Sequence, residues 1–264
     1  MLEIKNISKT FNAGTINEKK ALDNLSLTLN DGDFVTVIGG NGAGKSTLLN
    51  AIAGTFMIDG GSVILDGKDI TKLPEHKRAA DLGRVFQDPM MGTAPTMQIE
   101  ENLALAARRG KKRGLGWGIT EGERAGYKEA LASLGLGLEE RMTSKVGLLS
   151  GGQRQALTLL MATIRKPKLL LLDEHTAALD PKTAAKVLEI TDEIIERDHL
   201  TTLMITHNMK DAIKHGNRLI MMDAGKVVLD ISGEEKKALT VADLLARFSL
   251  ASGHDEANDK LLLS

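Results

Sequence analysis

The stretch GGNGAGKST, residues 39–47, constrains this chain more than any other feature of its sequence. It follows the apolar, β-branched run FVTVI and precedes the helical run LLNAIAG. In this order of strand, loop and helix, glycines bring backbone amides close to a phosphate, while a lysine and a hydroxyl complete the site. The sequence therefore predicts a phosphate-binding loop that holds a nucleotide.

Each part of this loop has an expected task. The glycines leave room for a phosphate, so the amides of residues 42–47 can point at it, and the positive end of the following helix adds to them. Lys45 reaches the β and γ phosphates, the Ser46 hydroxyl ligates Mg²⁺, and Thr47 contacts the α phosphate. The predicted nucleotide-binding residues of the loop are Gly39, Gly40, Asn41, Gly42, Ala43, Gly44, Lys45, Ser46 and Thr47.

Two carboxylates follow the run of four leucines at residues 169–172. Such a run is typical of a buried parallel strand, and ligands bind at the carboxyl edge of open α/β sheets. Asp173 is the expected Mg²⁺ ligand, directly or through water, and Glu174 the expected general base that polarises the attacking water. An acidic strand end exposed to solvent is the alternative, and the phosphate-binding loop in the same chain argues against it.

Short β-branched runs alternate with helical patterns, which predicts an α/β fold with a largely parallel sheet. Turn signals at residues 66–67 and 223–225 predict two hairpins, and therefore an antiparallel portion as well. Between residues 96 and 165 strand signals give way to helical periodicity, including a helix from Thr120, so a helical insertion is expected there. The predicted strands are residues 34–38, 82–86, 169–172 and 200–206.

Composition narrows the classes of function. The 264 residues carry a formal charge of −1, so nothing in the bulk charge favours binding to nucleic acid. The absence of cysteine excludes disulfides, thiolate metal sites and cysteine nucleophiles. No apolar stretch reaches the length of a membrane span, and Glu3 and Lys5 interrupt any signal-peptide core, so we expect a chain that stays in the cytoplasm.

Residues 149–155 read LSGGQRQ, and with this motif the chain resembles the ATP-binding cassette (ABC) ATPases, the motor subunits of ABC transporters. Locally, Ser150 and Gln153 form a capping box that opens a helix. The resemblance adds a second task, because in this family two chains pack head to tail and this helix end closes on the γ phosphate held by the partner. It implies that Ser150, Gly151, Gly152 and Gln153 act on ATP in trans.

Further landmarks of the family occur in the expected order. Gln87 in RVFQDP matches a glutamine that touches Mg²⁺ and the attacking water and joins the core to the helical subdomain. Asp180 in AALDP matches an aspartate that crosses the dimer interface, although before Pro181 it is also a good N-cap. His207 in MITHNM matches the histidine that contacts the γ phosphate and orients the base. The resemblance thus implies that Glu174, His207 and Gln87 are catalytic.

Two positions depart from the common pattern of the family. Phe11 matches an aromatic that stacks on adenine, where most relatives carry tyrosine; an ordinary core aromatic is the alternative. His175 in DEHTAALDP replaces the proline of many members, which frees a backbone amide and loosens the loop that carries Glu174. The DEHTAALDP variant resembles a group of bacterial import ATPases encoded beside a permease and a lipoprotein-type binding protein, some of which handle aromatic amino acids.

The resemblance implies a complete working unit. Two copies of the chain, or two paired cassettes, close around two ATP molecules with Mg²⁺, hydrolysis reopens them, and the helical subdomain drives a separate membrane permease. An extracytoplasmic binding protein would take part indirectly, and the chain would lie at the cytoplasmic side of the membrane. The expected organisation is one ABC domain over residues 1–250, with a RecA-like core at 1–95 and 166–250, a helical signature subdomain at 96–165, and a tail at 251–264.

Other interpretations remain open at this stage. A soluble ABC ATPase that acts as an assembly factor without a transporter is the main alternative, because it fits the length and the motifs do not exclude it. A nucleotide switch without turnover is disfavoured by the intact Glu174 and His207, and repair or translation factors usually carry two cassettes or long insertions. The basic stretch RRGKKRGLGWG, residues 108–118, is expected to be a solvated loop, a contact for anionic lipid, or a contact for the permease.

Overall fold

The computed structural model describes residues 1–111 and 118–252 of the chain. It divides into two compact units, one made of Met1–Arg78 with the described residues from His199 onward, the other of Ala79–Asp198. Residues 112–117 of the basic stretch and 253–264 of the expected tail lie outside the described part. The two units are described one at a time, and the domain boundaries expected from the sequence stay a prediction.

The first unit contains most of the strands. Its strands are β1 (Leu2–Phe11), β2 (Lys19–Leu29), β3 (Phe34–Ile38), β4 (Gly60–Leu65), β5 (Lys68–Asp69), β8 (Thr202–Ile205), β9 (Arg218–Asp223) and β10 (Lys226–Ser232). Its helices are α1 (Lys45–Ala53), α2 (Glu75–Arg78), α7 (Met209–Lys214), α8 (Gly233–Lys237) and α9 (Val241–Ser252).

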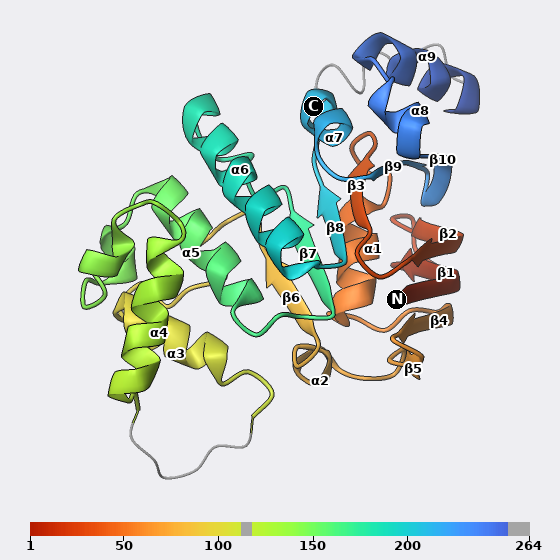
Figure 1. Cartoon of the computed structure of the whole chain (residues 1–264). Coiled ribbons are helices and arrows are strands. Elements are labelled where there is room, and N and C mark those ends of the chain that lie inside the picture. The colour runs from red at the N-terminus through yellow and green to blue at the C-terminus, as the bar shows by residue number, and fades with distance from the viewer. Residues whose placement is uncertain (112–117, 253–264) are drawn as a thin grey trace. The chain divides into compact units, whose positions relative to one another are not determined.

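These strands form one antiparallel sheet and one mostly parallel group. The antiparallel sheet has the order β2-β1-β4-β5, and in the other group β10, β9, β3 and β8 follow one another (Figure 1). β3 pairs in parallel with both β8 and β9, whereas β10 is antiparallel to β9. All five residues of β3 are buried, as expected for the centre of a parallel sheet. The predicted combination of α/β and antiparallel parts is confirmed.

Both predicted hairpins are present. Asp66 and Gly67, with φ of 53° and 73°, connect β4 to β5, and Ala224 and Gly225, with φ of 45° and 79°, connect β9 to β10. Two successive residues with positive φ are what a two-residue hairpin turn of the favoured twist requires. The turn at Ala224 is the less obvious one, because alanine rarely adopts this conformation.

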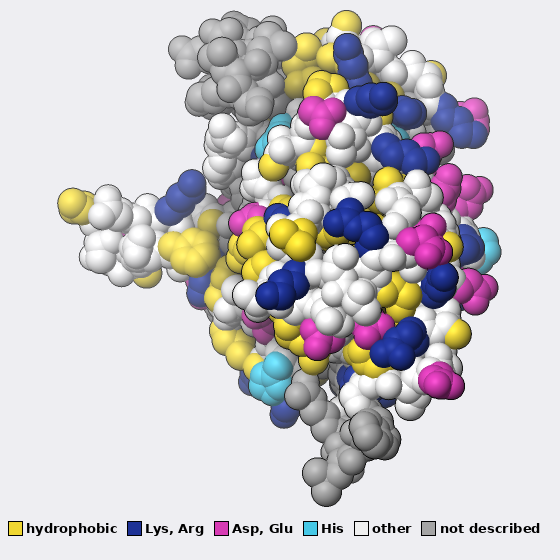
Figure 2. Space-filling model, turned by 90° about the vertical axis from the view of Figure 1, so that its left-hand side faces the viewer, with side chains coloured by type: hydrophobic (Ala, Val, Ile, Leu, Met, Phe, Trp, Pro, Cys, Tyr) yellow, Lys and Arg dark blue, Asp and Glu magenta, His cyan; other side chains and the backbone are white. Residues whose placement is uncertain are grey.

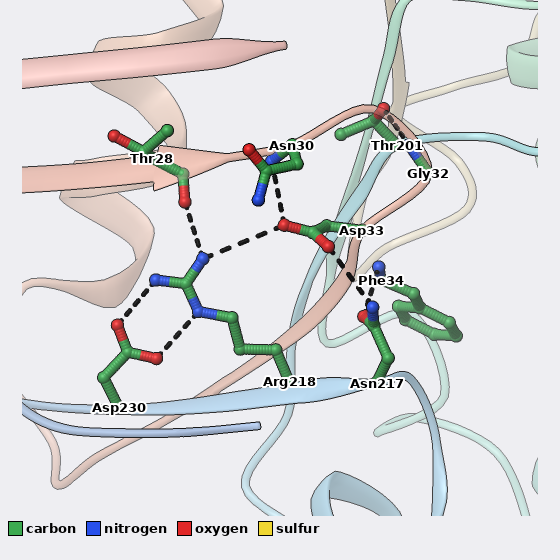
Figure 3. A network of polar contacts seen from close by, with 9 residues as sticks. All are labelled: Thr28, Asn30, Gly32, Asp33, Phe34, Thr201, Asn217, Arg218 and Asp230. Carbon is green, nitrogen blue, oxygen red and sulfur yellow. Dashed lines mark hydrogen bonds and ion pairs between the residues drawn. The ribbon is translucent and has the colours of Figure 1, made fainter. Parts of the chain in front are cut away.

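A polar network joins residues at the ends of several strands in the first unit (Figure 3). The guanidinium of Arg218 on β9 makes two hydrogen bonds to Asp230 on β10, at 2.7 and 2.5 Å, and a third to the carbonyl of Thr28 on β2, at 2.6 Å. Asn217 accepts from the amide of Phe34 at 2.8 Å and donates to Asp33 at 3.2 Å. The network therefore joins the antiparallel sheet to the parallel strands at the start of β3, the end away from the glycine-rich loop.

The second unit is mainly helical. It contains the strands β6 (Leu82–Val85) and β7 (Leu169–Asp173), the helices α3 (Ile99–Ala107), α4 (Glu121–Ala132), α5 (Gly151–Thr163) and α6 (Pro181–Asp198), and the short 3₁₀ turns η1 (Leu138–Glu140) and η2 (Val146–Leu148). The two strands pair in parallel with Val85 opposite Leu172. Among the described residues 96–111 and 118–165, no named strand occurs, as the sequence predicts.

The helix predicted to start at Thr120 is confirmed as α4. The Thr120 hydroxyl accepts from the amide of Glu123, and the Glu123 carboxylate in turn accepts from the amide of Thr120 at 2.8 Å. Tyr127, Leu131 and Leu134, which the helical spacing places on one face, are all buried. Local capping thus fixes where the helix begins, and burial of the apolar stripe holds it in place.

On the face that Figure 2 draws, basic and acidic side chains are interspersed rather than gathered by sign. Among the described residues, no helix combines the length and apolar character that a bilayer span requires.

Candidate nucleotide-binding site

The glycine-rich loop lies between the carboxyl end of β3 and α1, as the sequence predicts. Gly44 is the N-cap of α1 with φ of 99°, and a Cβ there would lie 2.4 Å from the carbonyl oxygen of Ala21. A Cβ on Gly39 would lie 2.2 Å from the carbonyl oxygen of Met222. These distances leave no room for any side chain, so packing alone requires the two glycines, apart from their predicted contact with a phosphate.

Lys45 and its neighbours give the loop its polar lining. The Lys45 ammonium is buried and donates to the carbonyl oxygens of Gly39 and Gly40 at 2.7 and 3.2 Å, which folds the loop around it. Ser46 is exposed and Thr47 half-buried at the start of α1. One expectation needs correction: the amide of Ala43 does not point at a ligand but donates to Gly40 at 3.1 Å, because it closes a tight turn inside the loop.

Phe11 is half-buried rather than part of the core. Its ring makes an edge-to-face contact with Phe56, with centroids 5.4 Å apart, and the ammonium of Lys9 lies 5.6 Å from each ring centroid. Lys9 is held there by Asp59 at 2.7 Å, and this hydrogen bond lowers the pKa of the Asp59 carboxyl. Phe11 is thus partly accessible, and its stacking on adenine stays a prediction.

Sequence reasoning missed Lys19 beside the loop. It is the cross-strand partner of Phe11 in the β1–β2 pairing, and its ammonium lies 3.0 Å from where a Cβ on Gly42 would stand. A cation at this distance from the loop backbone adds to the attraction for phosphate. The sequence alone does not predict that Lys19 pairs with Phe11, because a long turn separates the two strands.

His207 follows the end of β8, the strand that lies beside β3. The Thr206 amide donates to Val37 at 3.1 Å, so the chain leaves β8 at the same edge where the glycine-rich loop leaves β3. Directly after it, Asn208 caps α7 by accepting from Lys210 and Asp211 at 2.9 and 3.3 Å. The first unit thus brings the loop, Phe11 and His207 to one edge.

The second unit holds the two predicted carboxylates. Asp173 is the last residue of β7, and Glu174 follows in a left-handed conformation with φ of 46°. The Arg84 guanidinium on β6 lies 4.0 Å from the Asp173 carboxylate and stacks 4.5 Å above the ring of Phe86. Arg84, like Lys19, escapes sequence reasoning because only the strand pairing places it near the carboxylate.

Gln87 lies two residues beyond the end of β6 and is exposed. The carbonyl of the preceding residue, Phe86, accepts a hydrogen bond at 3.3 Å from the amide side chain of Gln155, which is buried in α5. Because β6 and β7 are parallel neighbours, Gln87 and Asp173 leave the same edge of this pair. This hydrogen bond joins the segment after β6 to α5, the helix that begins in the LSGGQRQ motif.

The signature helix α5 begins as the motif predicts. Ser150 and Gln153 form the capping box, with the Ser150 hydroxyl accepting from the Gln153 amide at 3.3 Å and the Gln153 side chain accepting from the Ser150 amide at 3.2 Å. Ser150 and Gly151 are exposed. A Cβ on Gly152 would lie 2.1 Å from the Thr183 methyl on α6, so this glycine permits the close approach of the two helices.

Asp180 is the N-cap of α6, and Pro181 is its first residue. The Asp180 carboxylate accepts from the Thr183 amide at 3.1 Å. Hydrogen bonds from Thr183, side chain first and then backbone, lower the pKa of the Asp180 carboxyl. The capping role is confirmed, and the role at a dimer interface stays a prediction.

The donor types fit a hydrated Mg²⁺ bound mainly through a nucleotide. Magnesium is held in such sites by one or two protein oxygens together with substrate phosphates and water. Ser46 offers a hydroxyl, Asp173 a carboxylate and Gln87 an amide oxygen, and all three are exposed or half-buried. Among the described residues no group of three or more His, Asp or Glu side chains could hold a metal by itself. The fit therefore rests on these oxygen donors together with a nucleotide.

Comparison with known proteins gives consistent results. The family model described as "ABC transporter" matches residues 22–177. The tyrosine transport ATP-binding protein of Clostridioides difficile is 47% identical over 95% of this chain and 100% of its own length. The spermidine/putrescine import ATP-binding protein PotA of Haemophilus influenzae is 35% identical over 89% of this chain, which spans 59% of that longer protein.

Solved structures agree with these sequence relatives. A dimeric, post-hydrolysis state of the ATP-binding cassette MJ0796 bound to ADP and Pi matches with a TM-score of 0.75 and 31% identity, over 88% of this chain and 98% of that one. The ADP conformation of MJ1267, an ATP-binding cassette of an ABC transporter, matches with a TM-score of 0.76 and 27% identity, over 100% and 98%.

Proposed function

We propose that this chain, which belongs to the ABC transporter family of ATP-binding cassettes, is the ATP-hydrolysing subunit of a bacterial importer. In this proposal two copies close around two ATP molecules and drive a separate membrane permease from the cytoplasmic side. The observation that carries the proposal is the glycine-rich loop, in which Gly39 and Gly44 leave no space for a Cβ and Lys45 is buried at the centre.

The glycine-rich loop is the proposed binding site of the triphosphate. The first amides of α1 lack partners within the helix and sit at its positive end, which favours a bound phosphate. Lys45 would contact the β and γ phosphates, and Thr47 the α phosphate. Phe11 would stack on the adenine through its exposed face. Ser46, Gln87 and Asp173 would hold Mg²⁺, which when bound supplies neutralisation of charge on the β and γ phosphates.

Hydrolysis needs a base and a group that orients it. Glu174 would take a proton from the attacking water, while His207 contacts the γ phosphate and orients Glu174, and Gln87 helps to place the water. Positioning and charge neutralisation would supply most of the rate enhancement, since phosphoryl transfer leaves little covalent work to the protein. A left-handed Glu174 directly after the β7 carboxylate supports this role.

The signature helix is proposed to act on the partner's nucleotide. Ser150, Gly151, Gly152 and Gln153 form a capped helix start that is suited to an anion, and within it Ser150 and Gly151 are exposed. Asp180 lies at the neighbouring start of α6. The dimeric form of a solved cassette that this chain resembles supports a paired arrangement. On this basis each site would take its glycine-rich loop from one copy and its signature helix from the other.

The transported substrate is proposed to be an amino acid. The support is the tyrosine transport relative, which is 47% identical over its whole length, and a role in import is supported by the PotA relatives as well. Substrate recognition itself would belong to the permease and an extracytoplasmic binding protein, both separate from this chain. In the domain organisation expected from the sequence, the core is residues 1–95 and 166–250 and the helical subdomain is residues 96–165. We expect this subdomain to transmit the motion that ATP causes to the permease.

The Glu174→Gln variant tests the chemistry. It keeps the shape of the side chain and removes the base, so ATP should still bind with an unchanged Kd while phosphate release falls at least a hundredfold. Glu193→Gln, an exposed change on α6, is the matched control and should hydrolyse ATP at the unmodified rate. Turnover by Glu174→Gln at the control rate would remove the proposed base.

A further inference from the structure

His175 is a buried side chain next to the proposed base, in the place where many family members carry proline. Its ring is 2% exposed, and its Nε2 lies 3.1 Å from the hydroxyl of Thr191, which is fully buried in α6. We propose that this hydrogen bond positions Glu174 for ATP hydrolysis, which makes His175 and Thr191 positioning residues. The inference rests on the proposed function, since it concerns the geometry of the same base.

The direction of the hydrogen bond follows from the neighbours of Thr191. A hydroxyl has one hydrogen to donate, and the Thr191 hydroxyl also lies 2.8 Å from the carbonyl of Val187, which can only accept. Thr191 therefore donates to Val187 and accepts from His175. His175 Nε2 therefore carries the hydrogen of this bond, which orients the ring relative to α6.

The backbone of Glu174 explains why such an anchor matters. With φ of 46° it occupies the left-handed region, which is unfavourable for a residue with a Cβ and persists where the surroundings enforce it. One local hydrogen bond, from the Ala177 amide to the Glu174 carbonyl at 3.0 Å, closes the turn that follows. His175 is the next residue, so holding its ring limits rotation about the bonds that aim the Glu174 carboxylate.

The loop is held to α6 at both ends. At its far end Asp180 accepts from the Thr183 amide at the start of the helix. At its first end, next to Glu174, His175 is hydrogen-bonded to Thr191. Thr191 lies ten residues after Pro181, which is about 15 Å along the axis of α6 at about 1.5 Å per residue. The segment 174–180 therefore runs along α6 between two fixed points, and the base sits beside the inner one.

This arrangement explains the departure from the family pattern. Proline stiffens a loop by fixing its own φ and needs no partner. Histidine leaves φ free, and here the stiffness is supplied by a hydrogen bond to a helix that is separate in sequence. The two solutions differ in one testable way, because only the second depends on Thr191.

Thr191→Val removes the hydroxyl and keeps the shape of the side chain. We expect kcat to fall about tenfold while the Kd for ATP stays within twofold, because the nucleotide-binding groups are untouched. Thr191→Ser, which restores the hydroxyl, should recover most of the lost rate. Thr163→Val is the matched control: Thr163 is also buried and bonds the carbonyl four residues earlier, Leu159, at 2.8 Å, and it should turn over at the unmodified rate.

A double-mutant cycle tests whether His175 and Thr191 act as a pair. His175→Phe fills the same space without a donor, so combining it with Thr191→Val should cost no more than either change alone. Additive losses of kcat would mean that the two residues act independently and would overturn the proposal.

Hydrogen exchange in the full chain gives a readout that is independent of turnover. With ATP bound, Thr191→Val should raise amide exchange severalfold within residues 174–180 and leave the rest of α6 protected. Unchanged exchange in that segment with an unmodified kcat overturns the positioning role. A fall in kcat matched by an equal loss of ATP affinity and of thermal stability overturns it too, since that is the result of structural damage alone. The proposed function fails if the unmodified chain does not hydrolyse ATP, or if Glu174→Gln hydrolyses it at the same rate. In either case the exchange measurement still shows whether the His175–Thr191 hydrogen bond holds the segment 174–180.

Discussion

Arg78 offers a stringent test of what holds the last turn of α1, the helix that follows the glycine-rich loop. It is 3% exposed, and its guanidinium donates to four backbone carbonyls at 2.8 Å each. Two of these carbonyls, at Ala51 and Ile52, are among the last of α1, the helix whose first turn belongs to the proposed phosphate site. Burial is the main influence on the Arg78 guanidinium and lowers its pKa from a high ordinary value.

The magnitude follows from these contacts. Removing a buried charged group that satisfies several partners costs about 3–5 kcal/mol, because the carbonyls lose donors that water cannot replace in a closed site. For a chain of this size each kcal/mol shifts the melting midpoint by about 2–4 °C, so Arg78→Ala should melt about 10 °C lower. Arg78→Lys keeps the charge but presents a single ammonium, so we expect roughly half of this loss.

Thermal unfolding of the full chain, followed by circular dichroism, measures the effect. Lys77→Ala, an exposed change on the same short helix, is the control and should melt with the unmodified protein. If Arg78→Ala melts within a degree of Lys77→Ala, the four hydrogen bonds contribute nothing and the reasoning is wrong. Should Arg78→Ala not fold at all, the graded loss in Arg78→Lys provides the same comparison.

Three further predictions concern single residues. Gly44→Ala should abolish ATP binding in an equilibrium titration, because its Cβ would meet the Ala21 carbonyl at 2.4 Å; binding at the unmodified Kd would refute this. Arg218→Ala should lower the free energy of unfolding in urea by about 2 kcal/mol, since it breaks the network around Asp230, and an unchanged midpoint would contradict it. The lowered folded pKa of Asp180 contributes stability above its unfolded pKa that is lost as pH falls through the folded value. Asp180→Asn should therefore flatten the loss of stability in acid, measured by melting between pH 5 and 3.

The parts of the fold that the sequence predicts best are those fixed by local chemistry. The glycine-rich loop is recognisable because its glycines, its lysine and its hydroxyls are adjacent in the sequence, between a strand and a helix. The starts of α4 and α5 are recognisable because Thr120 and Ser150 each form a capping box with a residue three positions later. In such cases a few adjacent residues contain all the information that the structure uses.

The N-terminal hairpin, by contrast, is not anticipated. β1 and β2 are the longest strands of the described chain, yet their pairing contains several register shifts, and Asn6 and Asn24 adopt positive φ of 50° and 48°. These irregularities break the alternation of apolar and polar residues that identifies a strand. The turn between the strands also lacks a short hairpin signature.

Contacts between distant residues are the other limit. Thr191 is an ordinary mid-helix residue until the fold brings it to His175, and Lys19 becomes relevant only through its pairing with Phe11. The effect of replacing proline by His175 therefore could not be judged from the motif, because the compensating partner lies sixteen residues away on another element.

The proteins that this chain binds in its host decide whether it powers a membrane importer. The tagged full chain would be isolated from membranes in mild detergent, and the proteins that copurify identified by mass spectrometry. We expect a polytopic permease together with an extracytoplasmic binding protein. Recovery with soluble partners alone, and absence of the chain from the membrane fraction, would contradict the transporter role and favour a soluble assembly ATPase.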